Sequence, residues 1–358
     1  MGKNIGIITY HNTNNFGACL HSIALCEKMR SWGWNAEIID YGCANILTRE
    51  CPTLRIPRSI RELFKMLFYE PILHIKYKTL RKEMMRLTHI SSKKYTLKNI
   101  SMSNNQYDVF FVGSDVVWAL DVSGRDYSYF LDFVKDDKIK MAFAASVGNC
   151  DLFRDDPLLP ILLKRFQSIA VREQEAQEWV YDISGVNAKY VCDPTMLLTS
   201  KEWDELICPN EYESDYVLVY FSDNEGKCIR DAITYATENN LVVKFINYGR
   251  HVKGTQSIRP ISLAQFIGYI KYAKMYFTAS YHGLLFGLYY NKQLRYYNRA
   301  RKSRMASLAR LCNIEDYCGD MKDEIGANPI NYDVVNQRIS EFREYSEHVL
   351  LDMLNTIK

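Results

Sequence analysis

Residues 275–288 read MYFTASYHGLLFGL, and this stretch organises our interpretation of the whole chain. Residues 275–277 are apolar enough for a short buried strand, and an apolar helix with two glycines follows a polar turn. His282 lies at the start of that helix, where backbone N–H groups point outward and favour an anion. Ser280 can cap the helix, and Gly283 would let a ligand approach its first turn. The alternative is a plain helix cap whose histidine bonds a local carbonyl.

Similar strand–turn–helix patterns extend outward from this stretch over the whole chain. We expect strands over residues 4–9, 36–40, 107–112, 139–147, 169–173, 190–192, 216–221 and 241–246, and helices over 18–32, 160–166, 201–208, 228–239, 263–271 and 333–354. Strands that alternate with helices indicate an α/β protein with doubly wound, Rossmann-like parallel sheets. A chain of 358 residues exceeds what one hydrophobic core usually supports, so we predict domains at 1–200 and 213–330 and a closing helix in 331–358.

Composition and charge exclude several classes of protein. The formal charge of +3 is too small to indicate nucleic-acid binding by itself. The ten cysteines show neither CxxC pairs nor the spacing of metal ligands, which favours reduced thiols in a cytosolic protein and predicts no metal site. No leader pattern and no run of 18 apolar residues is present, so we expect a cytoplasmic protein that at most attaches to a membrane surface.

Residues 49–98 form a basic insertion in the expected N-terminal domain. They contain thirteen Lys and Arg against four Glu, with apolar residues interleaved at 63, 64 and 66–69. This pattern predicts one or two basic amphipathic helices, which suit the anionic inner face of the cytoplasmic membrane or a phosphorylated lipid. The alternative is a solvated helical hairpin that covers the edge of the domain.

Five motifs follow one another along the chain. They are IITYHNTNNFGACL at 7–20, FFVGSDVVW at 110–118, AVRE at 170–173, DPTMLL at 193–198 and TASYHG at 278–283. In this order they resemble the signatures of the polysaccharide pyruvyl transferase family, over residues 5–315. The resemblance implies two Rossmann-like domains that face a cleft, as in the GT-B arrangement, and a role in bacterial exopolysaccharide or capsule assembly.

The resemblance also implies a reaction. Pyruvate would move from phosphoenolpyruvate onto two hydroxyls of a sugar, forming a cyclic ketal and releasing phosphate. Such a site needs an acid/base group and cations for the donor, with no cofactor beyond the co-substrate and no metal. His282 matches the catalytic histidine of the family, and histidine is readily poised near neutral pH. Asp115, at the end of a predicted strand, is our candidate base for the attacking hydroxyl.

Donor binding is expected from cations and from the turn that holds His282. Arg172 matches one arginine of the family pattern. The family has a second arginine at the position of Ser280, so one cationic contact with the donor is missing here. We expect Arg301 or Arg304 to supply that contact, beside Gly283. The alternatives are a surface pair of Arg172 with the neighbouring Glu173 and Glu175, and a solvated run of charge around residue 301.

The acceptor site is expected at the carboxyl ends of the N-terminal strands, where such sheets bind ligands. The loop with Asn14, Asn15 and Gly17 lies there, and so does Ser114. Tyr10, His11 and Trp118 could form a platform and a polar contact for a sugar. Each of these residues has an alternative role in packing, in a helix cap or in a plain connecting turn.

Two other functions stay open from the sequence. A GT-B-type nucleotide-sugar glycosyltransferase would share the layout and an anion pocket, and a non-catalytic sugar- or phosphate-binding homologue would explain Ser280. For the transferase, we expect phosphoenolpyruvate and a sugar acceptor as partners. An acceptor linked to undecaprenyl diphosphate would fit the basic insertion.

Overall fold

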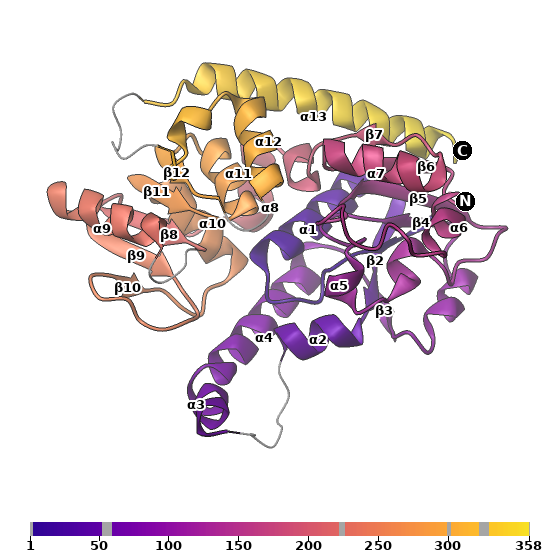
Figure 1. Cartoon of the computed structure of the whole chain (residues 1–358), viewed down its shortest axis with the longest axis horizontal. Helices are drawn as coiled ribbons and strands as arrows, with labels where there is room; N and C mark the ends of the chain where they lie inside the picture. Colours follow the sequence, from indigo (N-terminus) through magenta and orange to yellow (C-terminus); the bar gives the residue numbers. More distant parts are fainter. Residues whose placement is uncertain (1–2, 52–58, 222–225, 299–301, 322–328, 358) are drawn as a thin grey trace. The chain divides into compact units, whose positions relative to one another are not determined.

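The chain divides into two compact units in the computed structural model, which describes residues 3–51, 59–221, 226–298, 302–321 and 329–357 (Figure 1). At residues 61, 65 and 302–304 only the backbone is described. Unit 1 comprises Met1–Thr53, Leu80–Leu198 and Glu341–Lys358, and unit 2 comprises Leu54–Thr79 and Thr199–Ser340. Part of the expected insertion thus groups with unit 2, and part of the expected closing helix groups with unit 1. The domain limits expected from the sequence otherwise stay a prediction.

Unit 1 is built on a parallel sheet. Over the described residues it has seven strands in the order β3-β2-β1-β4-β5-β6-β7. The strands are β1 (Asn4–Ile8), β2 (Asn35–Tyr41), β3 (Ile90–Tyr95), β4 (Val109–Val112), β5 (Ile139–Ala145), β6 (Ser168–Val171) and β7 (Lys189–Tyr190). The connecting helices are α1 (Phe16–Ser31), α2 (Ala44–Glu50), α5 (Leu120–Ser123), α6 (Leu159–Leu163) and α7 (Gln174–Ser184), with 3₁₀ turns η1 (Ile100–Asn105), η2 (Tyr127–Phe130) and η3 (Pro194–Leu197).

Unit 2 repeats the plan with a smaller parallel sheet. Its described residues form five strands in the order β10-β9-β8-β11-β12. The strands are β8 (Tyr216–Tyr220), β9 (Val242–Ile246), β10 (Gln256–Ser257), β11 (Met275–Thr278) and β12 (Leu294–Tyr296). The helices are α3 (Ile60–Phe68), α8 (Ser200–Ile207), α9 (Lys227–Glu238), α10 (Leu263–Tyr272), α11 (Tyr281–Tyr289) and α12 (Lys302–Cys312), followed by the 3₁₀ turn η4 (Glu315–Tyr317).

Both sheets confirm the predicted α/β class. The chain adds strands outward from β1 and then reverses to β4, and it does the same from β8 to β11. This reversal defines a doubly wound sheet. The expectation that the two units face each other across a cleft stays a prediction.

Aromatic packing holds the core of unit 1 around Trp118. The indole ring stacks on Phe130 at a centroid distance of 5.4 Å and on Trp179 at 6.4 Å. Its N–H donates to the carbonyl of Tyr129 at 3.0 Å, so the one polar atom of the ring is satisfied inside the core.

Two long helices connect the units. Helix α4 (Glu70–Leu87) begins in unit 2 and ends in unit 1, and so does α13 (Tyr332–Asn355). The second half of α13 is fixed on unit 1 by Glu347, which pairs with Lys28 at 2.7 Å, and by Ser346, which accepts from the N–H of Cys192 at 2.9 Å. Among the described residues, no helix has the length and apolar character needed to span a bilayer.

One expectation for the basic insertion was wrong. Residues 90–95 form strand β3 at the edge of the sheet, where we expected helix. Ser91 and Tyr95 point inward while Lys94 stays exposed. Lysines are typical of edge strands because they discourage pairing with another chain. The basic composition of residues 49–98 gave no indication of this strand.

Gly113 offers a direct test of the backbone after β4. It has φ +135°, and an added Cβ would lie 1.9 Å from the carbonyl oxygen of Phe143. Gly185 has φ +72° but open space around the position of a Cβ. We expect Gly185→Ala to lower the free energy of unfolding by about 1–2 kcal/mol through backbone strain. Gly113→Ala should cost about 1–3 kcal/mol more through overpacking. Denaturant unfolding measures both, and equal losses would contradict the description.

Candidate functional site

Three of the five sequence motifs lie at the two points where the strand order reverses. In unit 1, Ile8 of β1 pairs with Val112 of β4, and the loops that follow contain Asn14, Asn15, Ser114 and Asp115. The chain leaves two adjacent parallel strands toward opposite sides at such a point, and ligands of doubly wound sheets bind there.

Unit 2 places the His282 turn at its own reversal point. Tyr220 of β8 pairs with Thr278 of β11, and α11 begins three residues later. The Thr278 hydroxyl donates to the carbonyl of Tyr220 at 3.1 Å and accepts from the N–H of Ser280 at 3.1 Å. This hydroxyl therefore fixes the end of β11, its neighbour β8 and the start of α11 together.

Ser280 is the N-cap of α11. Its hydroxyl accepts from the N–H of Gly283 at 3.2 Å, and its backbone is extended, as a cap requires. The residue that stands in place of the family arginine thus satisfies a backbone donor that would otherwise lack an intrahelical partner.

His282 is the second residue of α11 and is 7% exposed. Its ring meets that of Tyr281 edge-on, with centroids 5.4 Å apart. The first turn of a helix carries a partial positive charge, which favours an anionic ligand beside the imidazole.

Gly283 has a packing reason for its missing side chain. An added Cβ would lie 2.6 Å from both the hydroxyl of Thr278 and that of Tyr276. Gly287, one turn later, faces Leu294 and Tyr276 in the same way. The two glycines let α11 pack closely on β11, so the contact of Gly283 with a ligand stays a prediction.

The expected cations of unit 2 are only partly described. Arg301 lies outside the described residues, and Arg304 lies in α12 where only the backbone is described. Their part in donor binding stays a prediction.

Sequence reasoning missed Lys227, the first residue of α9. Cys228 and Ala279 pack in one apolar cluster, which brings their chain neighbours Lys227 and Ser280 to the same edge of the sheet. The Lys227 ammonium lies 2.9 Å from the Asp231 carboxylate, which also accepts from the Tyr297 hydroxyl at 2.6 Å. The signal was in the sequence, since the strand at residues 216–221 and the helix at residues 228–239 were both predicted.

Arg172 in unit 1 is enclosed by carboxylates. Its guanidinium donates to Asp193 at 2.6 Å, to Glu173 at 3.3 Å and to Asp115 at 3.4 Å, and its side chain is 1% exposed. Asp193 is itself fixed by the N–H and hydroxyl of Thr195 at 2.9 and 2.7 Å. The sequence motifs around residues 115, 172 and 193 therefore meet in one network. Arg172 does pair with Glu173, as the alternative expected, but the pair is buried instead of lying at the surface.

The backbone around Asp115 adopts rarely populated conformations. Asp115 has φ +67°, and Ala144 on the neighbouring strand has φ +54°. The Ser114 hydroxyl donates to the backbone carbonyl of Ala144 at 2.8 Å. The N–H of Ser146 donates to the backbone carbonyl of Asp115 at 3.0 Å. Such conformations cluster at functional sites, where the surrounding structure holds them in place.

The loop before α1 is anchored through its own side chains. Asn15 caps α1 by accepting from the N–H of Gly17 at 2.9 Å. The Asn14 amide donates to the carbonyl of Glu50, and the Thr13 hydroxyl donates to the Glu50 carboxylate at 3.3 Å. Asn15 is exposed and Asn14 is buried, so their expected contact with an acceptor stays a prediction.

The proposed sugar platform is buried. Trp118 is 1% exposed, and Phe130 and Trp179 stack on its ring, which argues against stacking on a sugar. Tyr10 packs edge-on against Tyr129 at 4.6 Å. The acceptor roles of Trp118 and Tyr10 stay predictions without support from this geometry.

The His11 side chain is buried and belongs to a series of polar contacts with Asp40 and Arg81. Its Nε2 lies 3.4 Å from Asp40, and Asp40 also pairs with Arg81. Burial raises the pKa of the Asp40 carboxyl, but the hydrogen bond with His11 and the charge of Arg81 outweigh it and hold the pKa below its usual 3.8. The structure thus gives His11 a local partner, and its contact with a sugar stays a prediction.

Comparison with known proteins assigns the chain to a family. A family model described as polysaccharide pyruvyl transferase matches residues 15–299. The chain belongs to the polysaccharide pyruvyl transferase family. The match runs from the N-cap of α1 through the Arg172 network to the His282 turn, and it confirms the predicted family and the broad class, a transferase of polysaccharide biosynthesis. No curated protein matches the chain.

Several solved structures resemble this pyruvyl transferase family member. One is spinosyn forosaminyltransferase, at 9% identity and a TM-score of 0.48, with 100% of both chains covered. Another is S. aureus MnaA with UDP, at 11% identity and a TM-score of 0.49, covering 100% of this chain and 98% of that one. A third is UDP-GlcNAc 2-epimerase from Neisseria meningitidis bound to UDP-GlcNAc, at 10% identity and a TM-score of 0.47. That match covers 97% of this chain and 93% of the epimerase chain. The strand orders, rather than these likenesses, define the fold.

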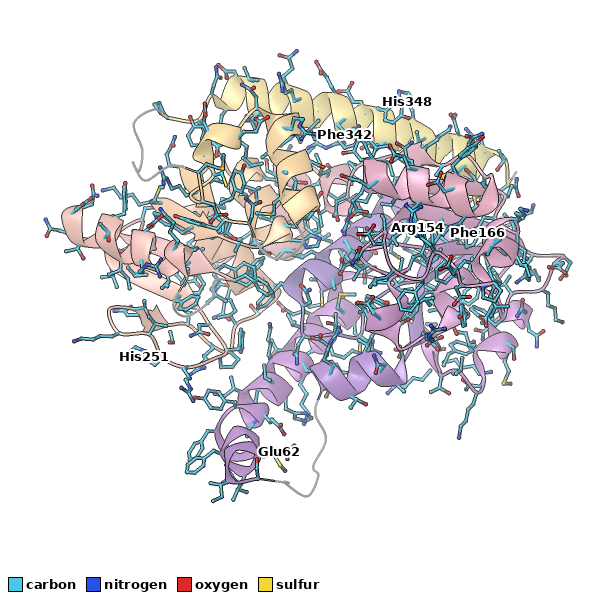
Figure 2. The ribbon with its side chains drawn as sticks, viewed as in Figure 1. Glu62, Arg154, Phe166, His251, Phe342 and His348 are labelled. Atoms are coloured by element: carbon cyan, nitrogen blue, oxygen red, sulfur yellow. The ribbon has the colours of Figure 1, made fainter. Side chains whose placement is uncertain are left out.

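The Arg172 network predicts a large cost for losing its cation. Arg172→Gln leaves buried carboxylates without their counter-charge and should lower the free energy of unfolding by about 3–5 kcal/mol. Arg154 pairs with Asp182 at 3.1 Å on the surface, so Arg154→Gln should cost about 0–1 kcal/mol (Figure 2). Chemical denaturation of both variants gives the comparison. A small loss in both would show that Arg172 has no role in holding the network.

Proposed function

We propose that this protein transfers pyruvate from phosphoenolpyruvate onto two hydroxyls of a sugar in a surface polysaccharide or its lipid-linked precursor. A cyclic ketal forms and phosphate leaves. The observation that carries the proposal is the family match over residues 15–299, which includes the His282 turn at the reversal point of unit 2.

The reaction is balanced without an oxidant or reductant. A proton adds to the methylene carbon of phosphoenolpyruvate, and the adjacent carbon becomes cation-like. One sugar hydroxyl attacks that carbon and forms the first C–O bond while its proton passes to a base. The C–O bond to phosphate then breaks, the second hydroxyl forms the second C–O bond of the ketal, and its proton passes to the departing phosphate.

His282 is the proposed acid in this scheme. An imidazolium can give its proton to the methylene carbon and recover one from the attacking hydroxyls over the cycle. Its place in the first turn of α11 puts this acid beside the helix end that favours the phosphate of the donor.

Further cations would balance the charge of the donor. We assign this role to Lys227, which follows β8 at the same edge as the His282 turn, together with Arg304. Arg172 was expected to contact the donor, but three carboxylates surround its guanidinium. We therefore propose it as a positioning residue that orients Asp115.

Asp115 is the proposed base for the acceptor hydroxyl. Carboxylates accept hydrogen bonds from sugar hydroxyls, and Asp115 lies with Asn14 and Asn15 at the reversal point of unit 1. The proposed setting is the cytoplasmic side of a bacterial membrane, with an undecaprenyl-diphosphate-linked oligosaccharide as acceptor.

Phosphate release from phosphoenolpyruvate tests this function. With galactose- or mannose-containing acceptors, we expect release by the wild-type protein that depends on the acceptor. His282→Gln should lower the rate about 10²- to 10⁴-fold, because the acid is lost while the side chain keeps a similar size. Lys227→Gln should raise the apparent KM for phosphoenolpyruvate.

His251→Ala is the matched control, since His251 is an exposed histidine of unit 2 (Figure 2). It should release phosphate at the wild-type rate. Melting temperatures of all variants separate a lost acid from a lost fold. If no acceptor gives release and phosphoenolpyruvate does not raise the melting temperature, the reaction is wrong and nucleotide-sugar donors become the next substrates to assay.

A further inference from the structure

Helix α3 exposes an apolar face. Large side chains at five of its nine positions are solvent-exposed: Ile60 at 77%, Leu63 at 41%, Phe64 at 57%, Leu67 at 60% and Phe68 at 59%. At 100° per residue these positions share an arc of roughly 140° on one side of the helix. Glu62 and Met66 lie on the other side by helical spacing and are half-buried.

This arrangement reverses the usual orientation of an amphipathic helix in a soluble domain, whose apolar face covers the core. The rings of Phe64 and Phe68 stack at a centroid distance of 5.7 Å, so the face holds a preformed aromatic pair. Contiguous exposed apolar surface of this kind marks an interaction site rather than a scattered surface residue.

The helix that follows carries positive charge on its exposed side. Only Tyr69 separates α3 from α4, and in α4 the cations Lys78, Lys82 and Arg86 recur every four residues and are all exposed. Ile75 and Met85, 50% and 64% exposed, lie on the same side by helical spacing. The acidic residues of α4 are elsewhere, since Glu70 is buried and Glu83 is half-buried.

We infer that α3 and the exposed side of α4 dock the protein on the surface of an anionic lipid bilayer. Interfacial segments combine an apolar face rich in Phe and Leu with exposed basic residues, and here α3 supplies the apolar face and α4 supplies the cations. The cations would be attracted to anionic headgroups while Phe64, Leu67 and Phe68 enter the boundary of the acyl region. A second copy of the chain is a poorer fit, because the stripe of cations would meet its own like charge.

The inference is independent of the proposed reaction. The α3 face contains none of the residues placed at the two reversal points, so vesicle binding can be measured without any substrate. A failure of docking and a failure of pyruvyl transfer are therefore distinguishable.

Co-sedimentation of the full chain with vesicles tests the docking surface. We expect the wild-type protein to bind vesicles of phosphatidylglycerol and phosphatidylcholine at least tenfold more tightly than vesicles of phosphatidylcholine alone. High salt should weaken the binding. Phe64→Ser with Phe68→Ser, and separately Lys78→Gln with Lys82→Gln, should each reduce it at least tenfold.

Ile161→Ser is the matched control, because Ile161 is 61% exposed on α6, well away from this segment in the sequence. It should bind as the wild-type protein does. Melting temperatures show whether each variant is folded. Equal binding to both kinds of vesicle, or unchanged binding of the Phe variant, would overturn the inference. A dimer in solution that dissociates in the Phe variant would assign the face to a second copy instead.

Discussion

In each unit, a buried threonine hydroxyl links the two central strands at their carboxyl ends. Thr278 donates to the carbonyl of Tyr220 at 3.1 Å, and Thr9, next after β1, donates to the carbonyl of Ser114 at 3.4 Å. These bonds lie where the strand order reverses and where the loops on either side diverge. The candidate chemistry of the protein depends on the geometry that they fix, because Ser280, His282, Ser114 and Asp115 all follow directly from these strand ends.

The two units use this common geometry differently. In unit 2 the edge is tightly packed, with glycines that bring α11 onto β11 and a serine that caps the helix. In unit 1 the edge holds charge, since Arg172 gathers Asp115, Glu173 and Asp193 inside the protein. In the reaction that we propose, the helix end of unit 2 serves the phosphate ester and the carboxylates of unit 1 serve the sugar hydroxyls.

The sequence predicted the parts of the fold that depend on local patterning. Apolar runs located the central strands, and the order of motifs located the sheet edge of unit 1 that carries Asp115 and the sheet edge of unit 2 that carries His282. It missed β3, because ISSKKY has the composition of a basic loop or helix and becomes a strand only through pairing with β2. It could not show that Trp179 would stack on Trp118 or that His11 would meet Asp40, because these partners lie far along the chain. The sequence alone also did not show which carboxylates would pair with the buried Arg172.

Deuterium transfer from solvent tests the central claim, pyruvyl transfer with proton delivery to the donor, most directly. The reaction is run in D₂O with phosphoenolpyruvate and a sugar acceptor, and the product is analysed by mass spectrometry and NMR. The account predicts an acceptor that gains pyruvate less one water, with one deuterium in the methyl group of each ketal. An acceptor of unchanged mass, or a ketal methyl without deuterium, would contradict it.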